Sequence, residues 1–388
     1  MKKKNVVLYL AVLSVFAGSN CLGGIDGALS KIAEAMNVSH STALYAGTGA
    51  ALACMLSGLL FGAIAGKKLP YKACAVLGLS LVSISGSLSV FVTTFPLLLV
   101  MRCLFGLGVG GLMCISNPIA TKLIAEEKRA SILGIGTCVA FGAQCVLQLV
   151  GGALADIRWN LVFLANLLMF VPLIVAVLFL PKMEKDVTSA KKEGKTKLPA
   201  AAILMCLVQG IVWLNIGPLL FGSAFYVAPI SDSAMVAAII AMMFSFGCMA
   251  GGLLYASLYK VFGRRCFPVF LLMAAVGLII SAAANNIILL AIGFFIGGVG
   301  QACMQAGIMM LLGKICSDTQ LGTASALLTV CLNLGAFLCS SWGSLIGKFT
   351  GGDTLYAPLY IGSAMFAVIA VILLVKSPFP KNEGVTAE

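Results

Sequence analysis

The stretch FPLLLVMRCLFGLGVGGLMCISN, from Phe95 to Asn117, carries one charged side chain in 23 consecutive residues. A bilayer hydrocarbon core of ~30 Å requires ~20 apolar residues of α-helix to cross it. Comparable stretches follow one another from Val6 to Val375, separated by short polar breaks. The sequence therefore predicts an all-α membrane protein with twelve transmembrane helices. The predicted spans are residues 6–29, 42–66, 73–93, 95–117, 130–153, 159–181, 199–223, 232–258, 266–284, 287–313, 322–347 and 354–376.

The composition excludes most soluble classes. Apolar residues make up 61% of the chain and charged residues 10%, against roughly a quarter charged in soluble domains. Strand-period alternation is missing, which argues against a transmembrane barrel. The fourteen cysteines fall in or beside apolar stretches without metal-ligand or disulfide-framework spacing, so we interpret them as small hydrophobic residues. No metal site is predicted.

The distribution of lysine and arginine predicts the orientation of the chain. Twenty-one of the twenty-five basic residues lie in the N-terminus, the C-terminal tail and every second loop, and the alternating loops hold Lys31, Arg158 and Lys348. Both termini are therefore expected in the cytoplasm. The net charge of +12 reflects this topology, because the basic residues are spread over short segments rather than gathered on a nucleic-acid-binding face. The basic, apolar start could also pass for a signal peptide, but we treat it as the first span.

A long polar segment divides the chain into two halves. Residues 182–198 are basic, lack apolar periodicity and are expected to form a cytoplasmic linker. The predicted domains are therefore an N-terminal six-helix bundle, residues 1–181, and a C-terminal six-helix bundle, residues 199–388. Faint similarity between the halves, such as Gly108-Val109-Gly110 and Gly298-Val299-Gly300, suggests a parallel duplication.

These features, together with local motifs, resemble the major facilitator superfamily. Span 4 carries Arg102-x-x-x-Gly106-x-Gly108, as in the fourth helix of that family. Basic loops after spans 2 and 8 resemble the family's cytoplasmic loop motif, although Gly66 stands where its acid is expected. By this resemblance, the residues assigned to cytoplasmic gating loops are Gly62, Lys67, Lys68, Lys72, Gly263, Arg264 and Arg265.

The first span most resembles the twelve-span drug/proton antiporters of the superfamily. Asp26-Gly-Ala-Leu-Ser-Lys-Ile-Ala33 is similar to the end of helix 1 in those proteins, where an acid precedes a Leu-Pro-x-Ile-Ala sequence. In helix 5, Gly151-Gly152 matches the end of the antiporter signature, but the Gly-Pro that should precede it is replaced by Leu147-Gln148. The resemblance implies two pseudo-symmetric six-helix bundles and transport by alternating access.

Asp26 and Arg102 are the ionisable residues well inside the predicted spans. A charge within a membrane costs ~2.5–3.5 kcal/mol on insertion scales, which makes each residue a functional hypothesis. Arg102 lies about seven residues into span 4, so ~10 Å below the outer boundary at ~1.5 Å per residue, and Asp26 lies at similar depth. The resemblance places helices 1 and 4 beside the central cavity. We therefore predict that the two residues influence each other and form a proton-coupling pair. The alternative for Arg102 is a structural ion pair, and the alternative for Asp26 is a position in interfacial water.

Neutral polar and aromatic residues within the spans are candidates for the solute site. An amide facing lipid would leave polar groups unpaired, so these side chains should face protein or a wet cavity. Gln144 and Gln148, like Gln301 and Gln305, are four residues apart and share a helix face. Interhelical hydrogen bonds are the alternative role for the amides. For the aromatic residues, which could stack on a lipophilic solute, the alternative is lipid contact or an aromatic belt at the membrane boundary. The candidates are Asn20, Asn117, Gln144, Gln148, Gln209, Trp213, Phe221, Gln301, Gln305 and Asn333.

The function that these observations favour is secondary active transport of a small organic solute, with proton-coupled efflux as the first choice. The alternative is uptake or exchange of a small organic anion, with Arg102 binding its carboxylate. A non-transporting membrane sensor or scaffold is the hypothesis from another class. No phosphate-binding loop or catalytic set is present, so the protein is expected not to be an enzyme and to use no cofactor beyond a proton gradient. Its expected setting is the cell membrane, as a functional monomer that does not bind nucleic acid.

Overall fold

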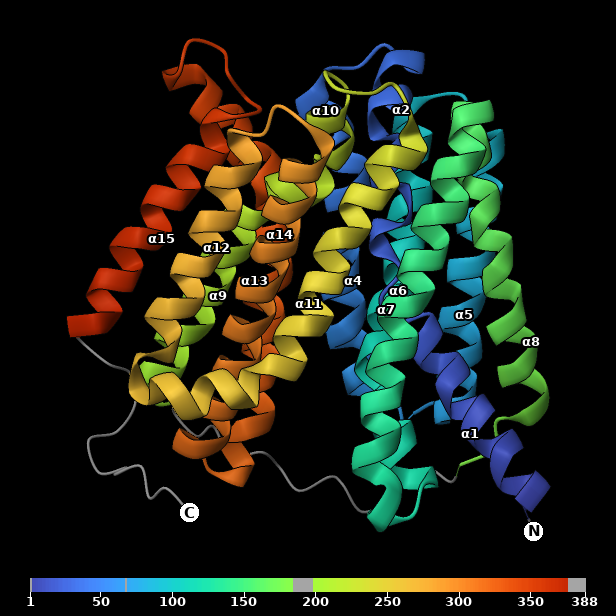
Figure 1. Cartoon of the computed structure of the whole chain (residues 1–388). Coiled ribbons are helices and arrows are strands. Elements are labelled where there is room, and N and C mark those ends of the chain that lie inside the picture. The colour runs from blue at the N-terminus through green and yellow to red at the C-terminus, as the bar shows by residue number, and fades with distance from the viewer. Residues whose placement is uncertain (1, 67, 184–197, 376–388) are drawn as a thin grey trace. The chain divides into compact units, whose positions relative to one another are not determined.

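The computed structural model describes residues 2–66, 68–183 and 198–375, almost all of which lie in helices or short connections (Figure 1). Among these residues, the extended pairing consists of one bridge between Ala65 and Leu69. Ten described helices are long and apolar enough to cross a membrane, and the bent pair Val6–Ala17 and Leu22–Ala35 would add an eleventh. The remaining predicted span, residues 266–284, corresponds to the 17-residue helix Cys266–Ala282. The prediction of an all-α, multi-pass membrane protein is confirmed.

The chain packs into two compact units. Unit 1 comprises Met1–Lys192 and Val227–Ile239, and unit 2 comprises Glu193–Tyr226 and Ile240–Glu388. The predicted linker lies mostly outside the described residues, so the domain boundary at 182–198 stays a prediction. The segment Val227–Ile239 is a feature that the sequence did not indicate, because it follows the first helix of the second half and yet packs within unit 1.

Unit 1 contains the helices of the first half of the chain. In order they are α1 (Lys2–Ala17), η1 (Leu22–Ala28), α2 (Leu29–Ala35), α3 (His40–Ala43), α4 (Tyr45–Ile64), α5 (Tyr71–Leu88), η2 (Ser89–Phe91), α6 (Phe95–Leu123), α7 (Glu126–Ile157), η3 (Trp159–Met169) and α8 (Phe170–Phe179). Unit 2 and the segment Val227–Ile239 contain α9 (Ala200–Phe221), α10 (Ser223–Val227), α11 (Ala234–Phe262), η4 (Gly263–Arg265), α12 (Cys266–Ala282), α13 (Ile287–Ile315), α14 (Asp318–Phe349) and α15 (Ala357–Val375).

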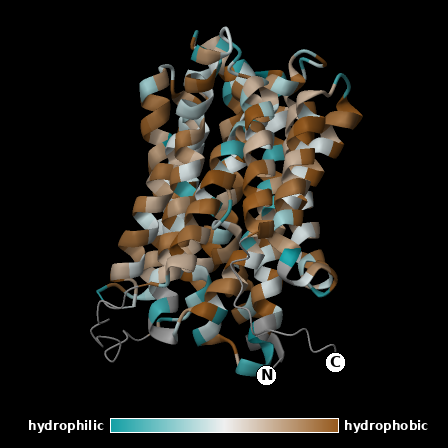
Figure 2. Cartoon of the chain, turned by 90° about the vertical axis from the view of Figure 1, so that its left-hand side faces the viewer, coloured by the Kyte–Doolittle hydropathy of each residue, from teal (hydrophilic) through white to brown (hydrophobic). Residues whose placement is uncertain are grey.

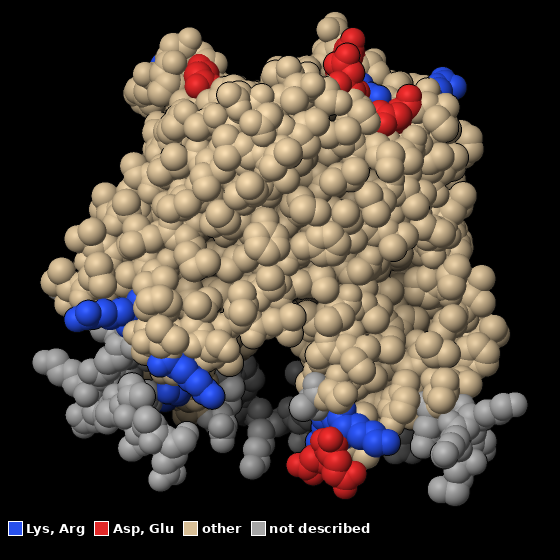
Figure 3. Space-filling view, in the orientation of Figure 1, with Lys and Arg blue, Asp and Glu red and all other residues tan. Residues whose placement is uncertain are grey.

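Apolar side chains cover the helices along most of their length. Hydrophobic residues dominate the middle of the helices, and hydrophilic residues are concentrated near the helix ends (Figure 2). On the face drawn in Figure 3, the lysine, arginine, aspartate and glutamate side chains lie near the helix ends, with a band free of charge between them. Exposed leucine, valine and isoleucine along these helices are expected of surfaces that face lipid.

Glycines allow the helices of each unit to pack closely. In unit 1, a Cβ added at Gly106 or Gly110 of α6 would overlap the carbonyl oxygen of Ala50 or Cys54 in α4. In unit 2, α11 and α13 meet in the same manner, and a Cβ at Gly298 would overlap the carbonyl oxygen of Phe244. Small residues are enriched at helix contacts in membranes because they permit such approach of the two backbones.

The first predicted span, residues 6–29, is not one continuous helix. Helix α1 ends at Ala17, and the chain continues through the 3-10 helix η1 into α2, with a bend of 52° between the two parts. Gly18, Gly23, Gly24 and Gly27 cluster in this region, and glycine lowers helix stability by about 1 kcal/mol relative to alanine. The break positions the main-chain carbonyls of η1 where side chains of other helices can reach them.

Candidate functional site

The break in the first span contains a fully buried acid. Asp26 lies in η1 and is 0% exposed. Both of its carboxylate oxygens are buried without a hydrogen-bond partner. Buried polar groups are nearly always hydrogen-bonded, and an exception calls for an explanation. This exception makes Asp26 the centre of the candidate site in unit 1.

Arg102 reaches the same break from α6. Its Nη2 donates to the Leu22 carbonyl oxygen at 2.6 Å, and its Nε donates to the Ala46 carbonyl oxygen of α4 at 2.8 Å. Its guanidinium carbon lies 4.7 Å from the centroid of the Phe105 ring. Arg102 therefore ties α6 to both η1 and α4.

Asp26 and Arg102 are close without forming a direct ion pair. Within the described residues, the ion pair shorter than 4 Å joins Lys31 and Asp156. The charges of Asp26 and Arg102 nevertheless interact electrostatically. Arg102 hydrogen-bonds to the carbonyl of Leu22, the first residue of η1, and Asp26 lies four residues later in the same short helix. Their role in proton coupling stays a prediction.

Two amides of α7 complete the cluster around Asp26. A Cβ built on Gly23 would lie 2.7 Å from Asp26 Oδ2, 2.9 Å from Gln144 Nε2 and 3.2 Å from Gln148 Nε2, so these groups converge on one point. Gln148 Nε2 donates to the Gly23 carbonyl oxygen at 3.3 Å, and its Oε1 has no partner. The spacing of four residues in the sequence, which predicts a shared helix face, brings both amides to the acid. We call Asp26, Arg102, Gln144 and Gln148 the Asp26 cluster.

Unit 2 contains a second set of buried polar groups, on α9. Gln209 is 0% exposed, and neither of its amide atoms has a partner. Trp213 follows one turn later on the same helix face, and its indole nitrogen is also buried and unpartnered. Phe221, near the end of the helix, is buried. Like Asp26, Gln209 and Trp213 have buried polar atoms without a hydrogen-bond partner.

The other amide candidates of unit 2 have hydrogen-bond partners. Gln301 donates to Gln305 Oε1 at 3.0 Å and accepts from the Cys248 thiol at 3.5 Å. Asn333 donates to the Thr329 carbonyl oxygen, one turn earlier on its own helix. For these residues the interhelical and intrahelical hydrogen bonds supply a sufficient structural role. In unit 1, Asn20 is half-buried at the break and Asn117 is exposed on α6.

The residues assigned to gating loops lie at helix ends. Gly62 and Lys68 are exposed, Lys72 is half-buried, Arg265 is exposed and Gly263 begins η4. Lys67 lies outside the described residues, as does the side chain of Arg264. Gly66 has a φ of 75°, a left-handed conformation that favours glycine. A tight turn thus explains the glycine at the position where the family motif has an acid.

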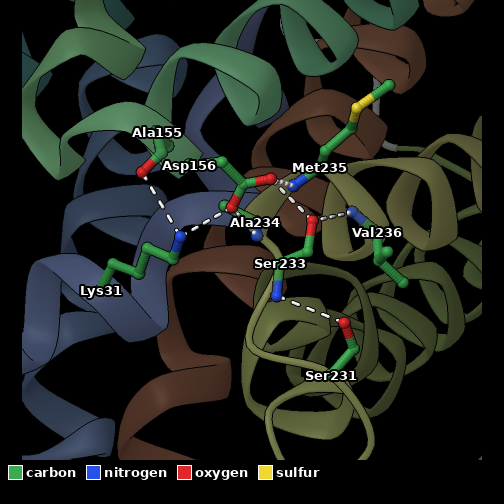
Figure 4. Close-up of polar contacts among 8 residues, drawn as sticks. All are labelled: Lys31, Ala155, Asp156, Ser231, Ser233, Ala234, Met235 and Val236. Carbon is green, nitrogen blue, oxygen red and sulfur yellow. Dashed lines mark hydrogen bonds and ion pairs between the residues drawn. The ribbon is translucent and has the colours of Figure 1, made fainter.

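Sequence reasoning missed a polar cluster at the end of unit 1 opposite the N-terminus. Figure 4 shows Lys31, Asp156 and Ser233 converging there at the start of α11. Lys31 Nζ lies 2.6 Å from Asp156 Oδ1, and Ser233 Oγ donates to Asp156 Oδ2 at 2.6 Å. In the sequence these residues are ordinary charged and hydroxyl side chains at the ends of spans. Lys31 and Asp156 are 125 positions apart, and Asp156 and Ser233 are 77 positions apart. Nothing local to any of them predicts the contact.

Comparison with known proteins identifies the family. The family model described as Major Facilitator Superfamily matches residues 8–232 and 230–388. The chain belongs to the major facilitator superfamily. An uncharacterized MFS-type transporter, YddS of Bacillus subtilis (strain 168), is 29% identical over 150 residues, which are 37% of this chain and 34% of that protein. The match therefore spans about a third of the length of this curated relative. The family and the named relatives are transporters rather than enzymes, in agreement with the prediction.

Solved structures of this superfamily share the fold. A D-xylose–proton symporter is 17% identical, with 98% of this chain and 99% of that chain covered and a TM-score of 0.75. A peptide transporter, POT, in complex with sulfate is 14% identical, with 96% and 94% covered and a TM-score of 0.80. The nucleoside transporter NupG is 13% identical, with 96% and 100% covered and a TM-score of 0.78. At these identities the likeness shows the fold alone.

Proposed function

We propose that this chain is a secondary active transporter that moves a small organic solute across the cell membrane by alternating access, with proton-coupled efflux as its mode. The membership of the superfamily supports the transport class. The observation that carries the coupling is the fully enclosed carboxylate of Asp26, which has no hydrogen-bond partner. Both chain termini would be cytoplasmic, and the monomer would be the functional unit.

The environment of Asp26 suits a group that gains and loses a proton. An ionised carboxylate enclosed without donors is costly. A proton removes that cost, and so does a solute that supplies donors to the two oxygens. Because either occupant satisfies the same atoms, proton and solute would compete for Asp26, and such competition couples their opposite movements. Coupling to protons is also the property named for one of the solved proteins with this fold.

Arg102 fits a positioning role better than an anion-binding role. Two of its donor nitrogens are directed at the carbonyl oxygens of Leu22 and Ala46. A solute carboxylate would have to displace these hydrogen bonds before it could bind the guanidinium. Uptake or exchange of an organic anion through Arg102 is therefore the less supported alternative.

Reconstitution into vesicles tests the proposal. Purified protein would be assayed with a library of labelled compounds, with and without a pH gradient, alongside Asp26→Asn. The proposal predicts gradient-driven movement of at least one compound by the wild type and loss of the gradient's effect in the variant. Gradient-driven transport by Asp26→Asn at the wild-type rate would overturn the assignment of Asp26. A protein that moves no compound under any gradient would favour the sensor or scaffold hypothesis.

A further inference from the structure

The polar cluster at the start of α11 is organised around one carboxylate. Asp156 Oδ1 accepts from the Ala234 amide at 2.6 Å, and Oδ2 accepts from the Met235 amide at 3.2 Å and from Ser233 Oγ at 2.6 Å (Figure 4). Ser233 Oγ also accepts from the Val236 amide. The acid at the end of α7 thus satisfies amides of another helix's first turn, which its own helix cannot satisfy.

Lys31 of α2 adds a third helix to the cluster. Its Nζ lies 2.6 Å from Asp156 Oδ1 and 3.4 Å from the Ala155 carbonyl oxygen. The ammonium lies beside the end of α7, where a positive charge is favoured, and Asp156 lies at the N-terminus of α11, where a negative charge is favoured. With side chains 28% and 31% exposed, the pair contributes mainly by fixing geometry rather than by its own energy.

Close backbone packing holds the same turn of α11 beside the candidate site. A Cβ at Gly27 would lie 2.8 Å from the Ala234 carbonyl oxygen and 2.7 Å from the Ala238 amide nitrogen. A Cβ at Gly152 of α7 would lie 2.9 Å from the same Ala234 oxygen. Gly27 is the residue after Asp26, so the first turns of α11 lie against the segment that contains the buried acid.

Helix α11 is anchored differently beyond these turns. The segment Val227–Ile239 belongs to unit 1, and the helix from Ile240 onward belongs to unit 2. There, a Cβ at Gly247 would overlap the Phe295 carbonyl oxygen of α13, and a Cβ at Gly251 would lie 2.7 Å from the Val299 carbonyl oxygen. The contacts of Asp156 therefore fix the first turn of α11 within unit 1, and the contacts with α13 lie within unit 2.

We propose that Lys31, Asp156, Ser233 and the amides of Ala234 and Met235 form a latch that holds the start of α11 over Asp26 and opens when the site is to be reached from this end. The role of this Asp156 latch in access to the site rests on the proposed function of Asp26. The contacts that form the latch do not depend on that function. While the latch is closed, the first turns of α11 cover η1 and keep Asp26 buried. When it opens, the acid can exchange its proton or its solute on that side.

Hydrogen–deuterium exchange of the whole protein in detergent tests the latch without any solute. Asp156→Asn removes the charge and one acceptor while keeping the shape of the side chain. We expect exchange to rise about fivefold to tenfold at Ala234 and Met235, the change that loss of an N-cap produces. The latch further requires a comparable rise in the peptide Leu22–Ala28, whereas the hydrogen bonds of Asp156 go to Lys31, Ser233, Ala234 and Met235. Ser233→Ala should give the same pattern at smaller amplitude and covers the case that Asp156→Asn folds poorly.

Asp353 provides a matched control in unit 2. Its carboxylate accepts from the amides of Leu355, Tyr356 and Ala357 before and within the first turn of α15. Asp353→Asn should loosen that turn and leave the exchange of Leu22–Ala28 unchanged. A rise confined to Ala234 and Met235 in Asp156→Asn would reduce Asp156 to an ordinary helix cap and overturn the latch. An unchanged pattern would overturn it as well. Because the assay needs no transport, a failed latch and a failed transport function are distinguishable.

Discussion

Replacing Arg102 with alanine removes the donor for two main-chain carbonyls and the cation above the Phe105 ring. Hydrogen bonds from a charged group contribute about 1.5–3 kcal/mol each. The lower end applies here, since Ala46 lies in a helix and its carbonyl keeps a backbone partner. We therefore expect the free energy of unfolding of unit 1 to fall by about 3 kcal/mol. For a domain of about 150–250 residues this corresponds to a fall in Tm of about 6–12 °C.

Thermal unfolding in detergent, followed by transport in vesicles, measures both consequences of Arg102→Ala. We expect the variant to insert, to unfold at the lower temperature and to transport nothing, because η1, which contains Asp26, is no longer tied to α6. Arg102→Lys keeps the charge but loses the planar guanidinium that reaches two carbonyls. Its Tm and its transport rate should therefore lie between those of the wild type and those of Arg102→Ala. Arg158→Ala, at an exposed arginine of unit 1, is the control. Wild-type Tm together with wild-type transport in Arg102→Ala would refute the reasoning.

Three further substitutions test separate features. Gly106→Ala forces a Cβ onto the Ala50 carbonyl oxygen and should lower Tm by several degrees through separation of α4 and α6; an unchanged Tm would contradict that packing. Gly23→Ala places a methyl 2.7 Å from Asp26 Oδ2, and it should raise the apparent KM for the solute more than it lowers Tm; a pure loss of Tm would count against a binding role. Gln209→Leu removes two buried, unpartnered amide atoms and should keep or raise Tm while transport falls; unimpaired transport would remove Gln209 from the site.

Several residues of the candidate site could be predicted from the sequence, because polar side chains are energetically costly within apolar spans. An acid and a guanidinium inside apolar spans are visible in the sequence, and the four-residue spacing of Gln144 and Gln148 places both on one helix face. The structure brings Asp26, Gln144 and Gln148 to Gly23, and Arg102 to the carbonyl of Leu22. The direction of Arg102 toward the Leu22 and Ala46 carbonyls could not be predicted in this way, because it depends on a helix break within a stretch that is apolar throughout.

The contacts between Asp156, Lys31 and Ser233 could not be predicted from the sequence. Asp156 and Lys31 read as charges at span ends, where water satisfies such groups at little cost. Their meeting with Ser233 depends on the packing of α2, α7 and α11 within unit 1, and on glycines whose role is to admit a neighbouring backbone. In the sequence, the segment Val227–Ile239 comprises the end of the short break after the span 199–223 and the start of the span 232–258.

Proton movement measured in Asp26→Asn tests the central claim most directly. Wild-type and variant vesicles would be loaded with a pH-sensitive dye, and the solute identified in the vesicle screen would be applied as a gradient. The account predicts that solute movement drives protons across the membrane in the wild type, whereas Asp26→Asn moves solute, if at all, without a change in internal pH. Solute-driven proton movement of equal size in both proteins would contradict it.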